Sequence, residues 1–288
     1  MKKQVCDIIT ESIISKLESG VIPWRKPWNA STQAPRNFIT GKPYRGINVF
    51  LLASTGYCSP YFLTFKQVQE KKAQVKTGSK GFPVVFWSTV EVEDRDTGTE
   101  KEIPFMRYYS VFNIEQTTLE VPPMPEAERE FNPIEEAERI VAAMPHRPEI
   151  RHQQAKAFYS PNFDYVNMPR QELFHGDAEY YSTLFHELGH STGHASRLTR
   201  KGVIESVYFG SHEYSKEELI AEMTAAFLCA EAGIVQATID NSAAYIGGWL
   251  KALKSKDNKA LVIHAASQAQ KATDFILVRK PEEMKAAA

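Results

Sequence analysis

The first part of the chain alternates helical and extended patterns of apolar residues. Apolar positions recur at helical spacing from Val5 to Leu17, and Gly20 follows them, so residues 4–19 predict an amphipathic helix whose apolar side faces a core. Two further short helices are expected, at 47–53 and 64–74.

Extended patterns come next. Residues 82–87 predict a strand, and the runs 89–93 and 105–112 predict a hairpin because they flank the polar turn 94–98. The first domain is therefore expected to have a mixed α+β fold.

A segment without periodicity separates this part from the rest. Residues 119–133 are rich in proline and acidic side chains, which is typical of a linker. We place the linker at 126–133, between a first domain at 1–125 and a second at 134–288. The second domain is expected to be mainly helical with a small sheet. Its short strands are predicted at 157–159 and 165–168, and its helices at 134–143 and near 178–193, 215–232, 241–253 and 258–270.

Composition supports two domains and excludes some classes. A chain of 288 residues exceeds the usual size of one hydrophobic core. No apolar run approaches the roughly 20 residues that cross a bilayer, and no secretory signal is evident, so we expect a cytoplasmic protein without a membrane partner. Cys6, Cys58 and Cys229 form no closely spaced pair, which argues against a disulfide framework and a cysteine zinc site.

The net charge of -1 conceals an uneven distribution. Residues 1–87 hold 13 Lys and Arg against 4 Asp and Glu, whereas the remainder holds 21 against 31. A basic module that attracts a polyanion, joined to an acidic module, would have this pattern. A solvated basic face without a nucleic-acid role is the alternative.

The strongest chemical signal is an H-E-x-x-H motif at residues 186–190. Residues four apart share one face of a helix, so His186 and His190 can present two imidazoles to one zinc ion at about 2.0–2.1 Å. Glu187 would take a proton from a metal-activated water molecule and deliver it to a leaving amine. The motif predicts peptide hydrolysis; a salt-bridged surface helix is the alternative.

The residues around the motif favour its interpretation as a metallopeptidase site. Leu188 and Gly189 suit a packed helix, and Gly189 would let another backbone approach closely. Residues 164–169 are expected to form an edge strand, which could pair with a substrate backbone.

A catalytic site needs a third protein ligand, and Glu218 and Glu222 are candidates on one helical face. His194 lies where the first helix is expected to end, and Ser196 stands where metzincins have their last His. Similar zincins in which a helical Glu completes the site have an E-x-x-A pattern followed by an acidic or amide residue. That resemblance implies Glu218 as the ligand and Glu222 as the acceptor that orients an imidazole, with the reverse order left open. Glu217 is expected to be a solvated charge.

An oxyanion-stabilising Tyr or His is also expected, and the sequence does not rank the candidates. They are Tyr180, Tyr181, Tyr208, His194 and His212.

Aromatic residues are interleaved with cations in the basic part of the chain. Bases stack on aromatic rings and phosphates pair with cations, so this combination predicts a single-stranded-DNA site. Core packing is the alternative for each tryptophan. The candidate DNA-binding residues are Trp24, Arg25, Lys26, Trp28, Lys42, Tyr44, Arg45, Lys76 and Lys80.

Several motifs in order resemble the ArdC antirestriction family, whose amino-terminal half is similar to the accessory region of TraC-type plasmid primases. The motifs lie at residues 20–28, 41–48, 80–87, 111–113, 186–190 and 217–222. The resemblance covers nearly the whole chain. It implies a single-stranded-DNA-binding domain joined to a zincin-like metallopeptidase domain, carried by mobile elements and protecting incoming DNA from host restriction. No primase catalytic site is evident.

The sequence thus predicts a zinc-dependent, gluzincin-like peptidase that binds single-stranded DNA. Other divalent ions such as Mn²⁺ suit the same ligands. The protein substrate is unidentified, and a host restriction component is one possibility. The alternative is a non-catalytic protector that coats DNA and whose metal is structural. A processing peptidase whose basic region docks an acidic protein is a third possibility.

Overall fold

The computed structural model describes residues 5–19, 22–24, 34–93, 100–123, 132–204, 212–234, 249–250, 253–254 and 260–279. The elements of the first part are α1 (Val5–Glu18), β1 (Arg36–Asn37), α2 (Ile47–Ala53), β2 (Tyr61–Thr64), α3 (Phe65–Glu70), β3 (Phe82–Glu93), β4 (Glu100–Asn113) and the short 3-10 helix η1 (Ile114–Gln116). Those of the second part are α4 (Pro133–Ala143), β5 (Glu149–Arg151), β6 (Phe158–Ser160), β7 (Tyr165–Asn167), η2 (Gln171–Leu173), α5 (Asp177–Ser191), α6 (Lys201–Ile204), α7 (His212–Glu231) and α9 (Leu261–Ile276).

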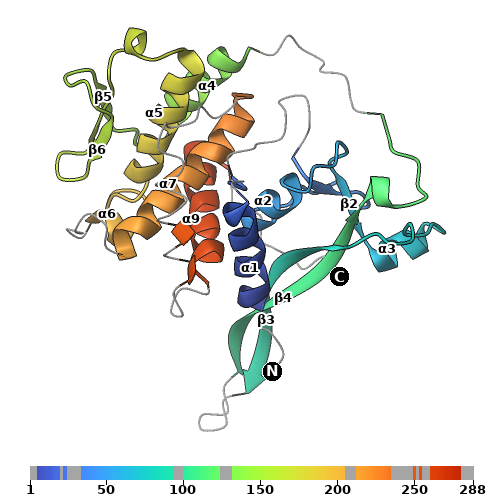
Figure 1. Cartoon of the computed structure of the whole chain (residues 1–288). Helices are drawn as coiled ribbons and strands as arrows, with labels where there is room; N and C mark the ends of the chain where they lie inside the picture. The colour runs from blue at the N-terminus through green and yellow to red at the C-terminus, as the bar shows by residue number, and fades with distance from the viewer. Residues whose placement is uncertain are drawn as a thin grey trace.

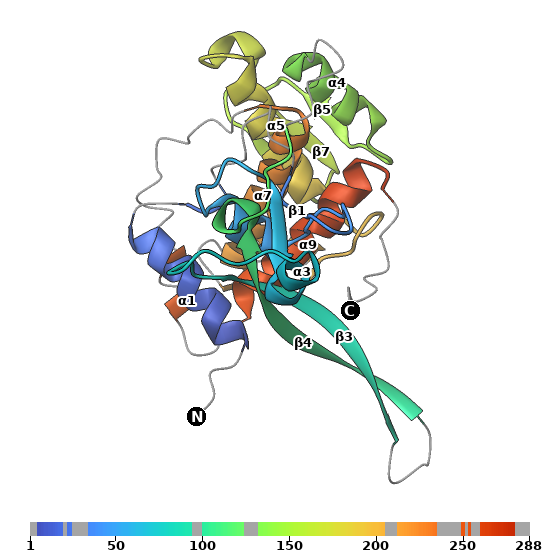
Figure 2. The same cartoon turned by 90° about the vertical axis from the view of Figure 1, so that its right-hand side faces the viewer.

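The first sheet has the strand order β1-β2-β4-β3. Strands β3 and β4 pair antiparallel along their whole length, and Figure 2 shows this long, twisted hairpin projecting from the body of the molecule. The two strands predicted at 82–87 and 89–93 are therefore one continuous strand. The predicted helix at 64–74 is shorter than expected: α3 starts with a capping box between Thr64 and Gln67 and ends at Glu70.

The second sheet is small and has the order β5-β7-β6. Strand β7 pairs parallel with β5 and antiparallel with β6, so it lies in the centre of the sheet. The expectation that residues 164–169 form an edge strand is wrong, because the unpredicted strand β5 covers the other side of β7. Helix α5 packs beside this sheet, and α4 lies close to it (Figure 1).

One hydrophobic core joins the two parts of the chain. Residues of α1, α2 and β3 pack with residues of α7 and α9 in a single buried cluster. The Phe50 ring stacks on Phe227 with the centroids 4.6 Å apart, and the Trp24 and Trp249 rings meet edge to face at 5.1 Å. Figure 1 shows α1 and α2 against α9, next to α7. The two domains are thus not separate bodies.

Most of the helix predicted at 241–253 lies outside the described residues.

Candidate metal centre

Helices α5 and α7 approach each other closely at a glycine. A Cβ atom built on Gly189 would lie 3.2 Å from Cα of Ala221 and 3.2 Å from Cβ of Thr224. Both facing residues are fully buried. The small side chains on both helices therefore allow the backbones to come near enough for side chains of α5 and α7 to meet, as the sequence predicted for Gly189.

Three potential ligand atoms converge at this crossing, from His186, His190 and Glu218. The two Nε2 atoms are 3.1 Å apart, and the Glu218 carboxylate oxygens lie 3.5 Å from Nε2 of His186 and 3.5 Å from Nε2 of His190. Ligands held tetrahedrally at the zinc bond lengths of about 2.0–2.1 Å are ~3.3 Å from one another. The spacing of these donors therefore fits one divalent cation.

A further carboxylate faces the other ring nitrogen of each imidazole. Glu222 lies 3.7 Å from Nδ1 of His186, and Glu217 lies 3.5 Å from Nδ1 of His190. Both glutamates are buried. Among the described residues, Nδ1 of His186 makes no hydrogen bond, because the Glu222 carboxylate at 3.7 Å is slightly too distant to accept one.

The carboxylates shift the pKa values of the ligand side chains. Burial alone would lower the pKa of His186, but Glu218, Glu222 and Glu187 outweigh burial and raise it to about 10. Burial would raise the pKa of Glu218, whereas the two imidazoles and a hydrogen bond from Tyr214 lower it to about 2. The site is thus rich in negative charge, which favours a cation between the imidazoles.

Glu217 is held by a buried arginine from the loop after α5. Arg200 donates Nε to Oε2 of Glu217 at 3.0 Å and Nη2 to Oε1 at 2.5 Å. Its remaining donors bond Thr192 Oγ1 and the Gly189 carbonyl. Burial would raise the pKa of Glu217, but the His190 imidazole and the Arg200 guanidinium together lower it. The expectation that Glu217 is a solvated charge is therefore wrong, since its side chain is only 7% exposed.

The loop that carries Arg200 can fold back because residue 193 is glycine. A Cβ atom there would lie 2.4 Å from Cγ2 of Val203 and 3.1 Å from Cζ of Arg200. The Gly193 carbonyl also accepts a hydrogen bond from the Arg200 backbone at 2.9 Å. Neither Glu217 nor Arg200 was among the predicted site residues, and the charge pair they form is not visible from spacing along the chain.

The predicted general base, Glu187, is buried on α5 and follows the first imidazole ligand. It lies three residues before His190, and residues at that spacing are neighbours on a helix.

Of the predicted oxyanion candidates, Tyr181 donates its hydroxyl to Glu138 at 3.0 Å, and His194 contacts Ser196 and Asp164. Tyr208 and the side chain of His212 lie outside the described residues. Tyr214, which bonds Glu218, was not predicted.

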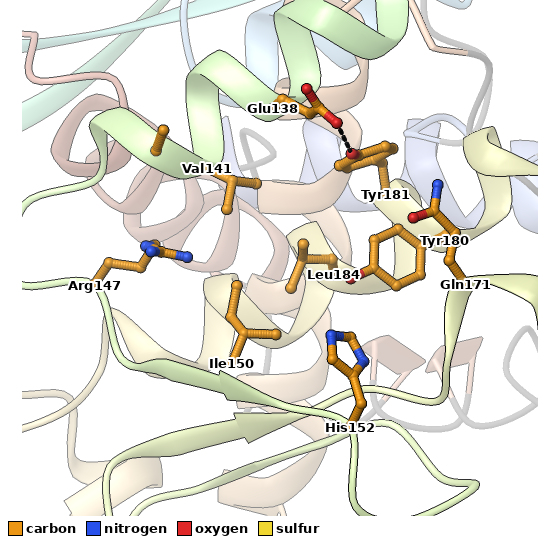
Figure 3. A pocket seen from close by; sticks show the side chains of 10 residues that line it. Glu138, Val141, Arg147, Ile150, His152, Gln171, Tyr180, Tyr181 and Leu184 are labelled. Atoms are coloured by element: carbon orange, nitrogen blue, oxygen red, sulfur yellow. Dashed lines mark hydrogen bonds between the residues drawn. The ribbon is translucent and has the colours of Figure 1, made fainter.

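An open cavity of about 270 Å³ lies on another side of α5, between α4, α5 and the end of β5 (Figure 3). Arg147 and His152 line it with the rings of Tyr180 and Tyr181. His186 is two residues beyond Leu184, the last α5 residue of the lining, and so points to a roughly opposite side of the helix. None of the three converging ligands lines this cavity.

The predicted DNA-binding residues that the structure describes do not form one exposed surface. Trp24 is 1% exposed in the shared core, and Tyr44 is also buried, which raises its pKa to about 12. The Trp24 ring packs on Phe50 and Trp249, as the core-packing alternative expects, and it cannot stack on a base in this conformation. Arg45 forms an ion pair with Asp274 of α9. Lys42, Lys76 and Lys80 are exposed, and Arg25, Lys26 and Trp28 lie outside the described residues.

Comparison with known families agrees with this geometry. The model of a zincin-like metallopeptidase family matches residues 135–268, so the helices that bear the converging ligands belong to a zincin-like domain. The model of the N-terminal domain of the anti-restriction factor ArdC matches residues 3–112. The two-domain α+β fold class is thereby confirmed, while the boundaries around the linker at 126–133 stay a prediction.

Relatives match nearly the whole chain. The crystal structures of the antirestriction protein ArdC from plasmid R388, metal-free and Mn(II)-bound, align with TM-scores of 0.75 and 0.76 at 38% and 37% identity. They cover 96% of this chain and 97% and 98% of those chains. The protein y4eC of Sinorhizobium fredii is 36% identical over 93% of this chain and 90% of its own length. This chain belongs to the ArdC antirestriction family.

Two Escherichia coli proteins named DNA primase TraC are also similar. They are 35% and 36% identical over 99% and 98% of this chain. The chain spans only 28% and 20% of their lengths, so the match concerns one segment of those primases. Within the described part of the chain, no helix is long and apolar enough to cross a membrane.

Proposed function

We propose that this protein is a metal-dependent peptidase that also binds single-stranded DNA and protects incoming DNA of a mobile element from host restriction. The observation that carries the peptidase proposal is the convergence of two imidazoles and one carboxylate on the facing sides of α5 and α7. The buried acidic side chain of Glu187 on the same helix supports a catalytic role rather than a purely structural one.

Each residue would have a defined task. His186, His190 and Glu218 would hold the cation, while Glu217 and Glu222 would orient the two rings. A divalent cation held there supplies Lewis acidity, which polarises a peptide carbonyl and acidifies water. Glu187 would accept a proton from the attacking water and pass it to the leaving amine.

Zinc is the proposed physiological ion, because two imidazoles and one carboxylate at tetrahedral spacing are typical of catalytic zinc sites. The same donors also bind other divalent ions, and one relative has been solved with Mn(II). The metal present in a purified sample can therefore depend on its availability during growth.

The proposed partners are single-stranded DNA and a protein substrate, for which a component of the host restriction machinery is our candidate. We place this activity in the cytoplasm, where incoming DNA meets restriction enzymes. The excess of basic residues in the first 87 positions supports contact with a polyanion.

Glu187→Ala tests the catalytic proposal, with Glu172→Ala as the control because Glu172 is an exposed carboxylate outside the site. The variant should retain its metal and its affinity for single-stranded DNA. It should lose cleavage of the substrate and protection of DNA transferred into a restricting recipient. Full protection by Glu187→Ala would contradict the catalytic proposal and favour a protein that protects DNA by coating it.

A further inference from the structure

We infer that single-stranded DNA binds to a face made by α3 and the adjoining side of β4. This α3–β4 face consists of Phe65, Tyr108 and Phe112 together with the lysines of the segment 66–80. The inference rests on the proposed function, which includes single-stranded-DNA binding, and it assigns that binding to residues other than most of those predicted from the sequence.

Exposed aromatic rings mark this face. The side chain of Phe65 is 52% exposed and that of Tyr108 is 46% exposed. Phe65 lies beside Phe112, with ring centroids 6.4 Å apart. Tyr108 and Phe112 are four residues apart on β4, so they point to the same side of the sheet and are separated by about 14 Å. The face therefore offers the Phe65–Phe112 pair and, farther along β4, the single Tyr108 ring, on which unpaired bases can stack.

A loop rich in lysine is fixed next to these rings. A Cβ atom on Gly81 would lie 3.2 Å from the tip of the Phe112 ring, so the backbone after Lys80 runs against that ring. Gln116 donates Nε2 to the Lys80 carbonyl at 3.0 Å, and its own carbonyl accepts from the Lys76 backbone at 2.8 Å. The loop is thus bound to η1, directly after β4, which keeps its cations close to the aromatic rings.

The charge of the segment suits a polyanion. Between residues 65 and 80 the sequence has a single acidic residue, Glu70, whose carboxylate lies 3.8 Å from the Lys66 amine. Five lysines of this segment are exposed. They are Lys66, Lys71, Lys72, Lys76 and Lys80. Lysines neutralise the phosphates of a bound nucleic acid. Aromatic rings with such cations beside them bind single strands with little sequence preference.

The position of the face separates it from the metal centre. Figure 1 shows α3 on one side of the molecule and α5 on the other, with α1, α2 and α9 between them. A strand bound at α3 would therefore leave the α5–α7 crossing free for a protein substrate.

Equilibrium binding of a labelled single-stranded oligonucleotide tests the aromatic part of the face. Phe65→Ala and Tyr108→Ala should each weaken binding by about tenfold, the order expected for removing one base–ring stack. Both rings are exposed, so both variants should keep the wild-type melting temperature. Phe163→Ala is the matched control, because that ring is 76% exposed and belongs to the turn between β6 and β7. Its affinity should equal that of the wild type.

The salt dependence of the same binding tests the lysines. The double variant Lys71→Gln/Lys80→Gln should lower the slope of log K against log salt by about 0.7 for each phosphate contact removed. Lys156→Gln, an exposed lysine of the other part of the chain, should leave the slope unchanged. Ultraviolet cross-links to bromouracil-substituted DNA should map to peptides that contain Phe65 or Tyr108.

The outcomes separate this inference from the function on which it rests. If the wild type binds single strands but the α3–β4 variants keep its affinity and salt slope, the assignment of the binding site to this face is contradicted. The proposed single-stranded-DNA binding itself would still hold. Equal affinity of the wild type for duplex and single-stranded DNA would also contradict this assignment, because paired bases cannot stack on the rings of the face. A wild type that binds no single strand would overturn both the face and the DNA-binding part of the proposed function.

Discussion

Arg200 fixes the carboxylate that faces His190. Its guanidinium bonds both oxygens of Glu217, and the Oε1 atom that it contacts lies 3.5 Å from Nδ1 of the imidazole. We therefore expect Arg200 to position the His190 ring, although its own side chain does not face the point where the candidate ligands converge. A carboxylate that faces the ring nitrogen not used for metal binding sets the orientation and basicity of a ligand imidazole.

Replacing Arg200 with methionine should weaken metal binding by about 10–100-fold, the range known for partners of ligand imidazoles. It should also lower the free energy of unfolding by about 3–5 kcal/mol, because Glu217 would remain buried without its cation. Metal titration and denaturant unfolding measure the two effects. Arg139→Met breaks an exposed pair with Glu136 and should cost about 1 kcal/mol or less, without changing metal affinity. Wild-type metal affinity in Arg200→Met would contradict the positioning role.

The sequence predicts which candidate ligand side chains converge better than it predicts which residues support them. His186 and His190 are four residues apart on one helix, so their convergence follows from helical geometry alone. Glu217 and Arg200 are 17 residues apart and meet only because the loop after α5 folds back at Gly193. No periodicity encodes such a pair, and the run of acidic residues around Glu217 resembles a solvated surface.

At the scale of elements, the close approach of α5 and α7 brings Glu218 to the two imidazoles. Gly189→Val would place branched carbon atoms against Ala221 and Thr224, which a Cβ alone would meet at 3.2 Å. Overpacking of this kind costs about 1–3 kcal/mol, and we expect the helices to move apart and metal affinity to fall. Calorimetric metal titration and thermal unfolding measure both. Ala178→Val introduces the same side chain at an exposed position of α5, where stability and affinity should change little. Unchanged metal binding in Gly189→Val would show that the approach is not needed.

Helices with a strong apolar period were predictable, and so were the short strands β6 and β7, whereas β1, β2 and β5 were not. Helices α1, α2, α4 and α5 lie within a few residues of their predicted bounds. Strand β5 consists of Glu149, Ile150 and Arg151, which has too few apolar residues to show a strand pattern. Missing β5 led to the wrong placement of β7 at an edge, because the position of a strand depends on its neighbours.

Across the whole molecule, the shared core couples the part that matches the ArdC N-terminal domain to the zincin-like part. Trp24 comes from the first and packs on Trp249 of the second. Trp24→Ala should lower the free energy of unfolding by about 3–5 kcal/mol, as is usual for large buried rings. Tryptophan fluorescence and metal release should follow one unfolding transition, since one core joins both parts. Phe65→Ala, at an exposed ring, is the control and should leave stability unchanged. Two separate transitions would contradict a shared core.

His186, His190 and Glu218 are the proposed ligands of one metal ion. The metal content of the wild type and of three variants, purified without chelators and measured by mass spectrometry, tests this ligand set. The wild type should contain roughly one divalent ion per chain, and His186→Ala and Glu218→Ala should lose it. Glu222→Ala should retain the ion with weaker affinity, because Glu222 faces Nδ1 of His186 and not the convergence point. A metal-free wild type, or an ion kept by Glu218→Ala and lost in Glu222→Ala, would contradict the ligand set described here.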